Sequence, residues 1–302
     1  MSEERVAEIL KRLQIKSRDE LKELHLKIFN SVPFFDVELA THCNNNCGIC
    51  PRDKISRPKG IMEPQVFENL SKWYPSNSNV MFCGMGEPLL NPNLIEYIKI
   101  NKKRELITNI TTNGILLTKS KIDELVESGI DLIQISVNAT SQKILDKISP
   151  KVNFEKLHHN LQYLSSVKPD NLDVQLTYIK QSQNFEEYDK VQTLANKLNF
   201  SFFSRIMHSR GGFLYNPESF SDIQGCGLFI KSTFITWEGD ILACCQDLTG
   251  TTKLGNIRNL TYSELINKKE QFINEDEWFP MCKNCDDLFS RYLFLDNPHY
   301  LD

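Results

Sequence analysis

Short apolar runs alternate with longer stretches of helical periodicity along most of this chain. The candidate strands lie at residues 34–40, 79–83, 106–112, 131–138, 172–179 and 200–206. Between them, apolar residues recur at helical spacing, as in Ile122, Leu125 and Val126, which Gly129 closes. This alternation predicts repeated βα units and a parallel sheet. Six such units indicate an α/β fold, a partial (β/α)6 TIM barrel that is three quarters of a complete one.

Two further segments flank the predicted barrel. Residues 3–30 carry aliphatic side chains at helical spacing and predict a helical N-terminal extension. Near the other end, strand-like segments at 232–237 and 241–245 are followed by a helical stretch from Thr261 to Phe272. We therefore expect an N-terminal helical extension at 1–32, a barrel core at 33–215, and a small separate α+β domain at 216–302.

Several candidate strands alternate apolar and polar residues, whereas parallel strands buried on both faces read as continuous apolar runs. The polar positions include Asp36 and Glu38, then Gln134, Ser136 and Asn138, then Asp173 and Gln175. The apolar faces suit the outer helices, so we expect the polar faces to line the lumen. A polar lumen in an incomplete barrel predicts a cavity for a hydrophilic ligand. An open antiparallel sheet that faces water is the alternative interpretation.

The composition is that of a globular protein, with 302 residues, 40% of them hydrophobic and 25% charged. No apolar run approaches the ~20 residues of a membrane span, and no signal-peptide core is present, so we expect a cytoplasmic protein without a membrane partner. The net charge of -4 comes without a block of basic residues, which argues against nucleic acid as a partner. Nine cysteines stand out, and in a reducing compartment they favour metal binding or catalysis over disulfides.

Three of the cysteines form a group directly after the first candidate strand. Cys43, Cys47 and Cys50 have the spacing C-x3-C-x2-C at the end of a barrel strand, where barrel enzymes carry their chemistry. Three thiolates in one loop can hold three irons of a 4Fe-4S cluster, which leaves the fourth iron open to a second molecule. A zinc clip is the alternative for this motif on its own.

With this motif the chain resembles the radical S-adenosylmethionine (SAM) superfamily, in which C-x3-C-x2-C stands at the same place. The segment from Cys83 to Pro88 resembles the family's GGEP segment, which contacts the SAM amino group. The resemblance implies a cluster on Cys43, Cys47 and Cys50 that cleaves SAM to a 5'-deoxyadenosyl radical. It also implies SAM contacts by Gly84, Gly86, Glu87, Thr112, Asn113, Ser136 and Asn138, the last two at the ribose.

Five cysteines follow the barrel: Cys226, Cys244, Cys245, Cys282 and Cys285. Their layout resembles the twitch domain, a shortened SPASM domain that holds an auxiliary 4Fe-4S cluster in some radical SAM enzymes. The resemblance implies Cys226, Cys244, Cys282 and Cys285 as ligands. No cysteine follows Cys285, so only one auxiliary cluster is implied. A structural zinc site is the alternative, because four thiolates also suit zinc.

Cys245 is left outside the implied ligand set. Consecutive side chains of a strand point to opposite faces, so we expect Cys245 to face away from the auxiliary cluster, toward the barrel mouth. A thiol there can return a hydrogen atom to a carbon radical. Cys83, the ninth cysteine, is interpreted as a small packed residue.

The leading interpretation is an epimerase with Cys245 as the hydrogen donor. Its substrate would be a polar small molecule such as a sugar, an aminocyclitol or another natural-product intermediate. An external electron donor such as flavodoxin or ferredoxin would be needed. The alternatives are a radical SAM dehydrogenase that oxidises an alcohol through the auxiliary cluster, a peptide-modifying (RiPP) radical SAM enzyme, and a non-catalytic zinc-stabilised binding protein.

Overall fold

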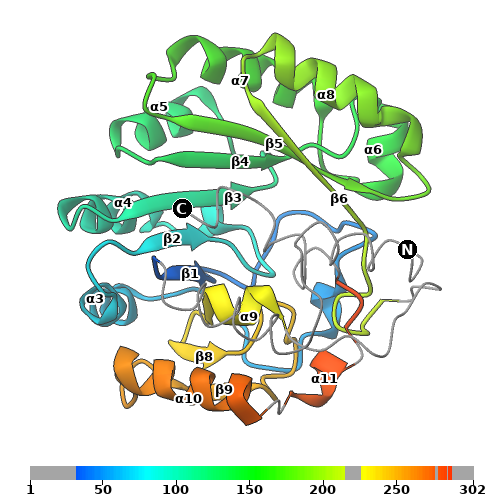
Figure 1. Ribbon diagram of the computed structural model, residues 1–302. Helices are drawn as coiled ribbons and strands as arrows, with labels where there is room; N and C mark the ends of the chain where they lie inside the picture. Colours follow the sequence, from blue (N-terminus) through cyan, green and yellow to red (C-terminus); the bar gives the residue numbers. More distant parts are fainter. Residues whose placement is uncertain (1–31, 215–225, 276–277, 284, 288–302) are drawn as a thin grey trace, which may run out of the picture.

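The computed structural model describes residues 32–214, 226–275, 278–283 and 285–287 (Figure 1). The expected helical extension at 1–32 lies outside the described residues, apart from its last position. The expected domain boundary at 215/216 falls in the undescribed segment 215–225, so the three domain ranges stay predictions.

One sheet organises the described part of the chain, in the order β6-β5-β4-β3-β2-β1-β7-β8-β9. Its strands are β1 Phe34–Val37, β2 Asn79–Phe82, β3 Ile107–Thr112, β4 Leu132–Ser136, β5 Asp173–Lys180, β6 Ser201–Ile206, β7 Ser232–Ile235, β8 Asp240–Leu242 and β9 Lys253–Asn256. The first six are the predicted βα strands, and neighbours among them pair in parallel. The partial barrel predicted from the alternation is therefore confirmed.

The sheet does not stop where the barrel pattern stops. Strand β7 pairs in parallel with β1, with Asp36 opposite Phe234, and the antiparallel strands β8 and β9 follow it. All four residues of β7 are buried. Helix α9 leads directly into the strand, and Lys269 of α10 donates to the carbonyl of Ser232 in it at 2.6 Å. The first strand of the C-terminal unit thus extends the barrel sheet, where the sequence had suggested a strand of a separate unit.

Helices cover the outer face of this sheet, with α5, α7 and α8 over β4–β6 at one end and α10 beside β9 at the other (Figure 1). The α-helices are α3 Pro64–Trp73, α4 Leu94–Lys103, α5 Lys119–Glu127, α6 Gln142–Ile148, α7 Phe154–Val167, α8 Tyr188–Lys197, α9 Gly227–Lys231, α10 Tyr262–Glu275 and α11 Pro280–Lys283, and the 3-10 helices are η1 Pro51–Lys54, η2 Pro88–Leu90 and η3 Phe185–Glu187. In the part of the chain that the structure describes, no helix has the length and apolar character needed to cross a membrane.

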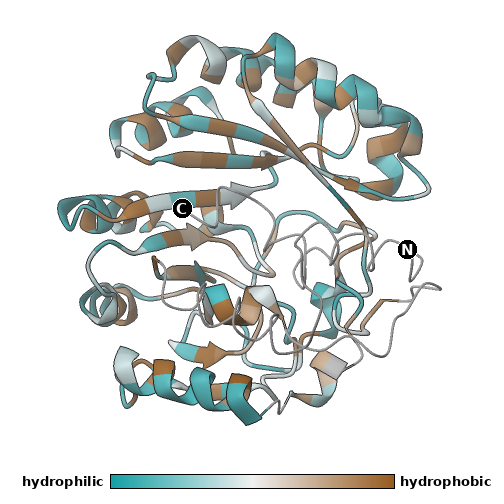
Figure 2. Cartoon of the chain, in the orientation of Figure 1, coloured by the Kyte–Doolittle hydropathy of each residue, from teal (hydrophilic) through white to brown (hydrophobic). Residues whose placement is uncertain are grey.

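The two faces of the strands differ as the alternation predicts. Brown and teal bands alternate along β5 in Figure 2, where Val174 and Leu176 are buried and Gln175 is half-buried. The outer face of β1 carries an aromatic contact: the ring of Phe35 meets that of Trp73 edge-on, with 5.8 Å between the centroids. Burial of such apolar faces against helices is the main stabilising term of the fold.

Two helix ends test the local predictions. Gly129 follows α5 with φ at 75°, the left-handed conformation that glycine adopts at a helix end, so this predicted end is confirmed. Asn184 with Glu187 three residues on predicts a capped helix start at Asn184, but η3 comes first there and α8 begins at Tyr188. The carboxylate of Glu187 accepts hydrogen bonds from the backbone N–H groups of Thr140 and Ser141 instead of capping its own helix. Tertiary contacts outcompete the local capping box here.

Candidate active site

The C-x3-C-x2-C loop leaves the carboxyl end of β1 and turns back through η1. Its three thiols are half-buried, and those of Cys43 and Cys47 receive N–H donors. The backbone N–H of Asn45 donates to Cys43 Sγ at 3.4 Å, and the Asn45 side-chain amide donates to Cys47 Sγ at 3.2 Å. The amide of Asn113, at the end of β3, reaches Cys43 Sγ at 3.6 Å. Hydrogen bonds to sulfur are one of the means by which proteins tune iron-sulfur clusters.

The three thiols act on one another electrostatically. Burial raises the pKa of Cys43, and Glu87 and Cys50 raise it further. Burial likewise raises the pKa of Cys47, with Cys50 and Cys43 adding to the effect. Binding of a cation would reverse this balance, since thiolates are the form that ligates iron.

The donor set fits an iron-sulfur cluster, because three soft sulfur ligands sit in one loop with N–H groups directed at them. Across the described ranges, however, no group of three or more His, Cys, Asp or Glu side chains has the geometry of a formed metal site. Cys43, Cys47 and Cys50 therefore remain predicted ligands.

The GMGEP segment closes over this loop at the end of β2. The backbone N–H of Glu87 donates to the carbonyl of His42 at 2.8 Å. A Cβ on Gly86 would lie 2.1 Å from the carbonyl oxygen of Ala40 and 2.5 Å from that of His42, so only glycine allows this approach. At Gly84 a Cβ would lie 2.7 Å from Glu38 Cγ. Gly86 is thus required for close backbone packing and Gly84 for space beside the Glu38 side chain, whatever they contact in SAM.

Glu87 is a buried carboxylate that ties together the ends of β2 and β3. It accepts hydrogen bonds from the Thr112 hydroxyl at 2.7 Å, the Asn113 N–H at 2.8 Å and the Leu89 N–H at 3.1 Å. Burial raises its pKa, against the opposing effect of these three donors. The side chain is 2% exposed, so its first role is to hold the predicted SAM segment in place.

Glu87→Gln is expected to lower the free energy of unfolding by about 2 kcal/mol, because an amide offers one acceptor oxygen to three buried donors. Denaturant unfolding followed by circular dichroism measures the change. Glu68→Gln is the control, since Glu68 forms an exposed pair with Lys72 on α3 and should leave the transition unchanged. Equal transitions for wild type and Glu87→Gln would contradict the structural role.

The remaining predicted SAM residues also lie at the carboxyl ends of strands. Thr112 and Asn113 end β3, and the Asn113 amide also donates to Asn44 in the cysteine loop at 2.8 Å. Ser136 ends β4 on the polar face, where it accepts a hydrogen bond from Thr177 at 3.5 Å. Asn138 follows it, and its side-chain oxygen accepts the N–H of Ile179 at 2.8 Å. The seven residues thus lie at one edge of the sheet, and their contacts with SAM stay predicted.

The second set of cysteines is brought together from three segments. Gln246 N–H donates to Cys244 Sγ and Asp287 N–H to Cys285 Sγ, both at 3.4 Å. The two loops are joined because the Gln246 amide donates to the Asp287 carboxylate at 2.8 Å. The N–H of Cys285 donates to the carbonyl of Cys282 at 3.3 Å, which keeps these two in one turn. Cys226 lies close enough to Cys244 to raise the pKa of its thiol.

Cys244 and Cys245 follow β8, which ends at Leu242, so the strand alternation that predicts their opposite orientation does not apply to them. The neighbouring Cys245 thiol, together with burial, raises the pKa of Cys244. Burial raises the pKa of Cys83 well above its usual value, and the nearby Asp36 and Cys245 raise it further. Cys83 is more than a packed residue, since its thiol donates to Asp36 at 3.2 Å.

Two residues of this region were missed by the sequence interpretation. Arg57 forms a buried pair with Glu38, and Asp247 accepts hydrogen bonds from the backbone and hydroxyl groups of Thr249 and Thr252. Burial would raise the pKa of Asp247, but these hydrogen bonds lower it. An aspartate followed by a run of threonine and glycine is the signal for such a turn, and it was available in the sequence.

Comparison with known proteins bears on both cysteine groups. The model of the Radical SAM superfamily matches residues 37–195, more than half of the chain. The model of the SPASM iron-sulfur cluster-binding domain matches residues 226–286. The tungsten-containing aldehyde ferredoxin oxidoreductase cofactor-modifying protein of Pyrococcus furiosus is 22% identical over 309 residues, which cover 82% of this chain and 86% of that protein.

Solved structures share the fold at low identity. BtrN in complex with AdoMet and 2-DOIA is 20% identical, with a TM-score of 0.59 over 87% of this chain and 96% of BtrN. SuiB of Streptococcus suis bound to precursor peptide SuiA is 14% identical, with a TM-score of 0.66 over 87% of this chain and 72% of SuiB. Native anSMEcpe with bound AdoMet is 16% identical, with a TM-score of 0.63 over 87% of this chain and 88% of that chain.

These matches confirm the predicted cofactor classes. A radical SAM domain implies a 4Fe-4S cluster and SAM, and a SPASM domain implies auxiliary iron-sulfur. Iron-sulfur binding is thereby favoured over the zinc alternative at both cysteine groups. The chain belongs to the radical SAM superfamily and carries a SPASM iron-sulfur cluster-binding domain toward its C-terminal end.

Proposed function

We propose that this protein is a radical SAM epimerase that acts on a polar small molecule, with Cys245 as the hydrogen donor. Cys43, Cys47 and Cys50 would hold the SAM-binding cluster, and Cys226, Cys244, Cys282 and Cys285 the auxiliary cluster. When bound, the first cluster and SAM supply a 5'-deoxyadenosyl radical. The observation that supports the proposal is that Cys245 is near enough to Cys83, which follows β2 and precedes the predicted SAM segment, to raise the pKa of the Cys83 thiol.

A polar substrate is supported by the inner face of the barrel. The hydroxyl of Thr111 donates to the side-chain oxygen of Gln134 at 2.9 Å, and the Gln134 amide donates to that of Gln175 at 2.9 Å. The three residues stand opposite one another on β3, β4 and β5 and are half-buried. Such a row of amides and hydroxyls offers directional hydrogen bonds to the hydroxyl and amino groups of a sugar or aminocyclitol.

In the proposed reaction one hydrogen atom leaves the substrate and one thiol returns a hydrogen atom to it. The 5'-deoxyadenosyl radical takes a hydrogen atom from a substrate C–H bond and becomes 5'-deoxyadenosine. Cys245 then returns a hydrogen atom to the opposite face of the carbon, so the product is an isomer of the substrate. The sulfur radical that remains on Cys245 needs one electron and one proton to restore the thiol. An external donor such as flavodoxin or ferredoxin would supply the electron in a cytoplasmic setting.

A second candidate is a peptide-modifying enzyme. It is supported by the shared fold of SuiB, solved with a precursor peptide, and of anSMEcpe, solved with a Cp18Cys peptide. A dehydrogenase that oxidises an alcohol through the auxiliary cluster is the third. A dehydrogenase needs no hydrogen donor, so replacement of Cys245 distinguishes it from the epimerase.

The test is anaerobic reconstitution with iron and sulfide, followed by incubation with SAM, a reductant and a panel of sugars and aminocyclitols in D2O. We expect one class to stimulate 5'-deoxyadenosine formation and its product to carry one solvent deuterium. Cys245→Ala should still cleave SAM but form no epimer. An oxidised product that persists in Cys245→Ala would favour the dehydrogenase, and stimulation by peptides alone would favour the peptide-modifying enzyme.

A further inference from the structure

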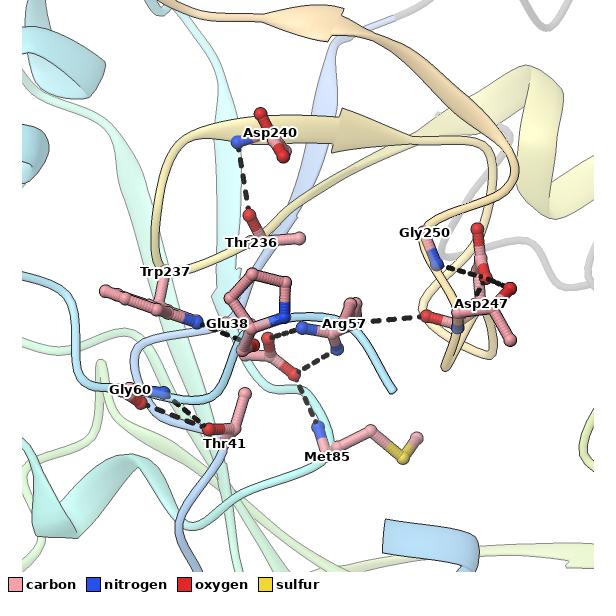
Figure 3. A network of polar contacts seen from close by, with 12 residues as sticks. Glu38, Thr41, Arg57, Gly60, Met85, Thr236, Trp237, Asp240, Asp247 and Gly250 are labelled. Atoms are coloured by element: carbon pink, nitrogen blue, oxygen red, sulfur yellow. Dashed lines mark hydrogen bonds and ion pairs between the residues drawn. The ribbon is translucent and has the colours of Figure 1, made fainter. Parts of the chain in front are cut away.

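A buried ion pair joins the segment that precedes the first cysteine loop to the turn that follows Cys244 and Cys245. The guanidinium of Arg57 meets both carboxylate oxygens of Glu38, at 2.7 and 2.8 Å, in the two-pronged arrangement that arginine forms with carboxylates. The side chains are 5% and 0% exposed, respectively. Figure 3 shows the pair enclosed between Met85 on one side and Asp247 on the other. Charges removed from water to this extent are costly unless they are paired and hydrogen-bonded, so this geometry is tightly constrained.

The pair joins segments that are far apart in the sequence. Glu38 leaves β1 just before the first cysteine loop, and its Oε2 also accepts the backbone N–H of Met85 at 3.1 Å. The Nε–H of Arg57 donates to the carbonyl of Asp247 at 3.1 Å. The carbonyl of Leu248 accepts the N–H groups of Ser56 at 3.0 Å and Arg57 at 3.2 Å. One guanidinium therefore contacts the end of β1 and the turn that follows Cys244 and Cys245.

The turn on the far side is stiff, so a contact with it fixes more than one residue. The carboxylate of Asp247 is fully buried and closes the turn through Thr249, Gly250 and Thr252. Leu248 packs with Ile55 and Met85 in a small apolar cluster. A shift of Arg57 would therefore also shift the loop that carries Cys244 and Cys245.

We propose that Arg57, held by Glu38, is a positioning residue that sets the placement of the auxiliary cysteine loop relative to the SAM-binding cysteine loop. This inference rests on the proposed function, since it assumes that both loops carry clusters. Lysine cannot replace the arginine in this role, because an ammonium has neither the planar fork for Glu38 nor the separate Nε–H that reaches Asp247.

The variants for a test are Arg57→Lys, Arg57→Met and the double variant Glu38→Met/Arg57→Met. Arg57→Met leaves a buried carboxylate without its partner and should lower Tm, whereas the double variant removes both charges and should recover most of that loss. Lys102→Met is the control, since Lys102 pairs with Asp131 at 2.7 Å at the opposite, amino ends of β3 and β4.

Two measurements separate positioning from stability. In metal-free protein, hydrogen exchange of residues 246–252 should quicken roughly tenfold or more in all three Arg57 variants, including the double variant with recovered Tm. In reconstituted, reduced protein, the magnetic coupling between the two clusters should change in the same variants. Lys102→Met should alter neither. Wild-type exchange and coupling in the double variant would overturn the inference and leave Arg57 as a stabilising residue only.

Failure of the inference differs from failure of the proposed function. A wild-type protein that binds two clusters and cleaves SAM, with Arg57 variants indistinguishable from it, would leave the enzyme assignment standing and remove the positioning role. A wild-type protein that takes up no iron would remove the enzyme assignment, whereas the exchange measurement on metal-free protein would still report whether Arg57 holds the loop.

Discussion

Replacement of Cys43, Cys47 and Cys50 together by alanine is expected to remove about half of the reconstituted iron and to abolish 5'-deoxyadenosine formation. The loss should be on the order of a thousandfold or more, because enzymatic rate accelerations are about a millionfold or larger and this variant lacks the ligands of the reactive centre. Iron and sulfide analysis, with chromatography of the nucleoside product, measures both effects. The predicted auxiliary ligands Cys226, Cys244, Cys282 and Cys285 are unchanged in this variant, so the remaining iron should stay.

Cys83→Ser provides the matched thiol control. Cys83 is also half-buried at the end of a strand, but it donates to Asp36 and belongs to neither predicted ligand set. Its iron content should equal that of the wild type. Complete loss of iron in the triple variant would mean that the two sites do not load independently, and undiminished SAM cleavage would remove Cys43, Cys47 and Cys50 from the cluster.

Gly86→Ala is expected to destabilise the protein by about 3 kcal/mol, the largest effect of a single methyl group in the site. The added Cβ would lie 2.1 Å from one backbone carbonyl oxygen and 2.5 Å from another. Backbone atoms cannot rotate out of the way as a flexible side chain can, so the GMGEP segment would have to separate from the cysteine loop. Thermal unfolding should show Tm lower by roughly 5–10 °C, and SAM binding should weaken in isothermal titration.

Gly48→Ala isolates the steric cause. Gly48 lies within the cysteine loop, yet a Cβ there would meet nothing nearer than the Lys147 carbonyl oxygen at 4.0 Å. Its unfolding transition should match that of the wild type within about 0.5 kcal/mol. If both alanine variants unfold alike, the close packing around Gly86 does not govern stability.

The positions of the strands could be predicted from the sequence because each strand carries its own signal. The alternation of apolar and polar residues in β4 and β5, and the short apolar runs in the other strands, predicted the bounds of the six βα strands to within a few residues. The cysteine spacing then placed the site at the end of β1 without any three-dimensional information. Local pattern and global fold agree in this half of the chain, as is typical of a well-specified domain.

The pairing of strands that are far apart in the chain could not be predicted from the sequence in the same way. The parallel pairing of β7 with β1 joins Asp36 to Phe234, nearly two hundred residues apart, and no local pattern encodes a partner. The contacts of Arg57 could not be predicted for the same reason. In the sequence an arginine in a loop resembles any other solvated charge, and only the fold brings Glu38 and Asp247 to it. The predicted orientation of Cys245 assumed a strand through Cys244 and Cys245, but β8 ends at Leu242, before the apolar run in the sequence does.

The seating of β7 beside β1 restricts how the C-terminal region can be removed. A chain cut before β7 would leave the backbone donors and acceptors of Phe34–Val37 unpaired along one side, on a strand whose residues are all buried in the intact protein. An apolar strand with a free edge is a template for pairing between molecules. Shortened forms that keep only residues up to β6 should therefore aggregate, even though every predicted ligand of the first cluster is still present.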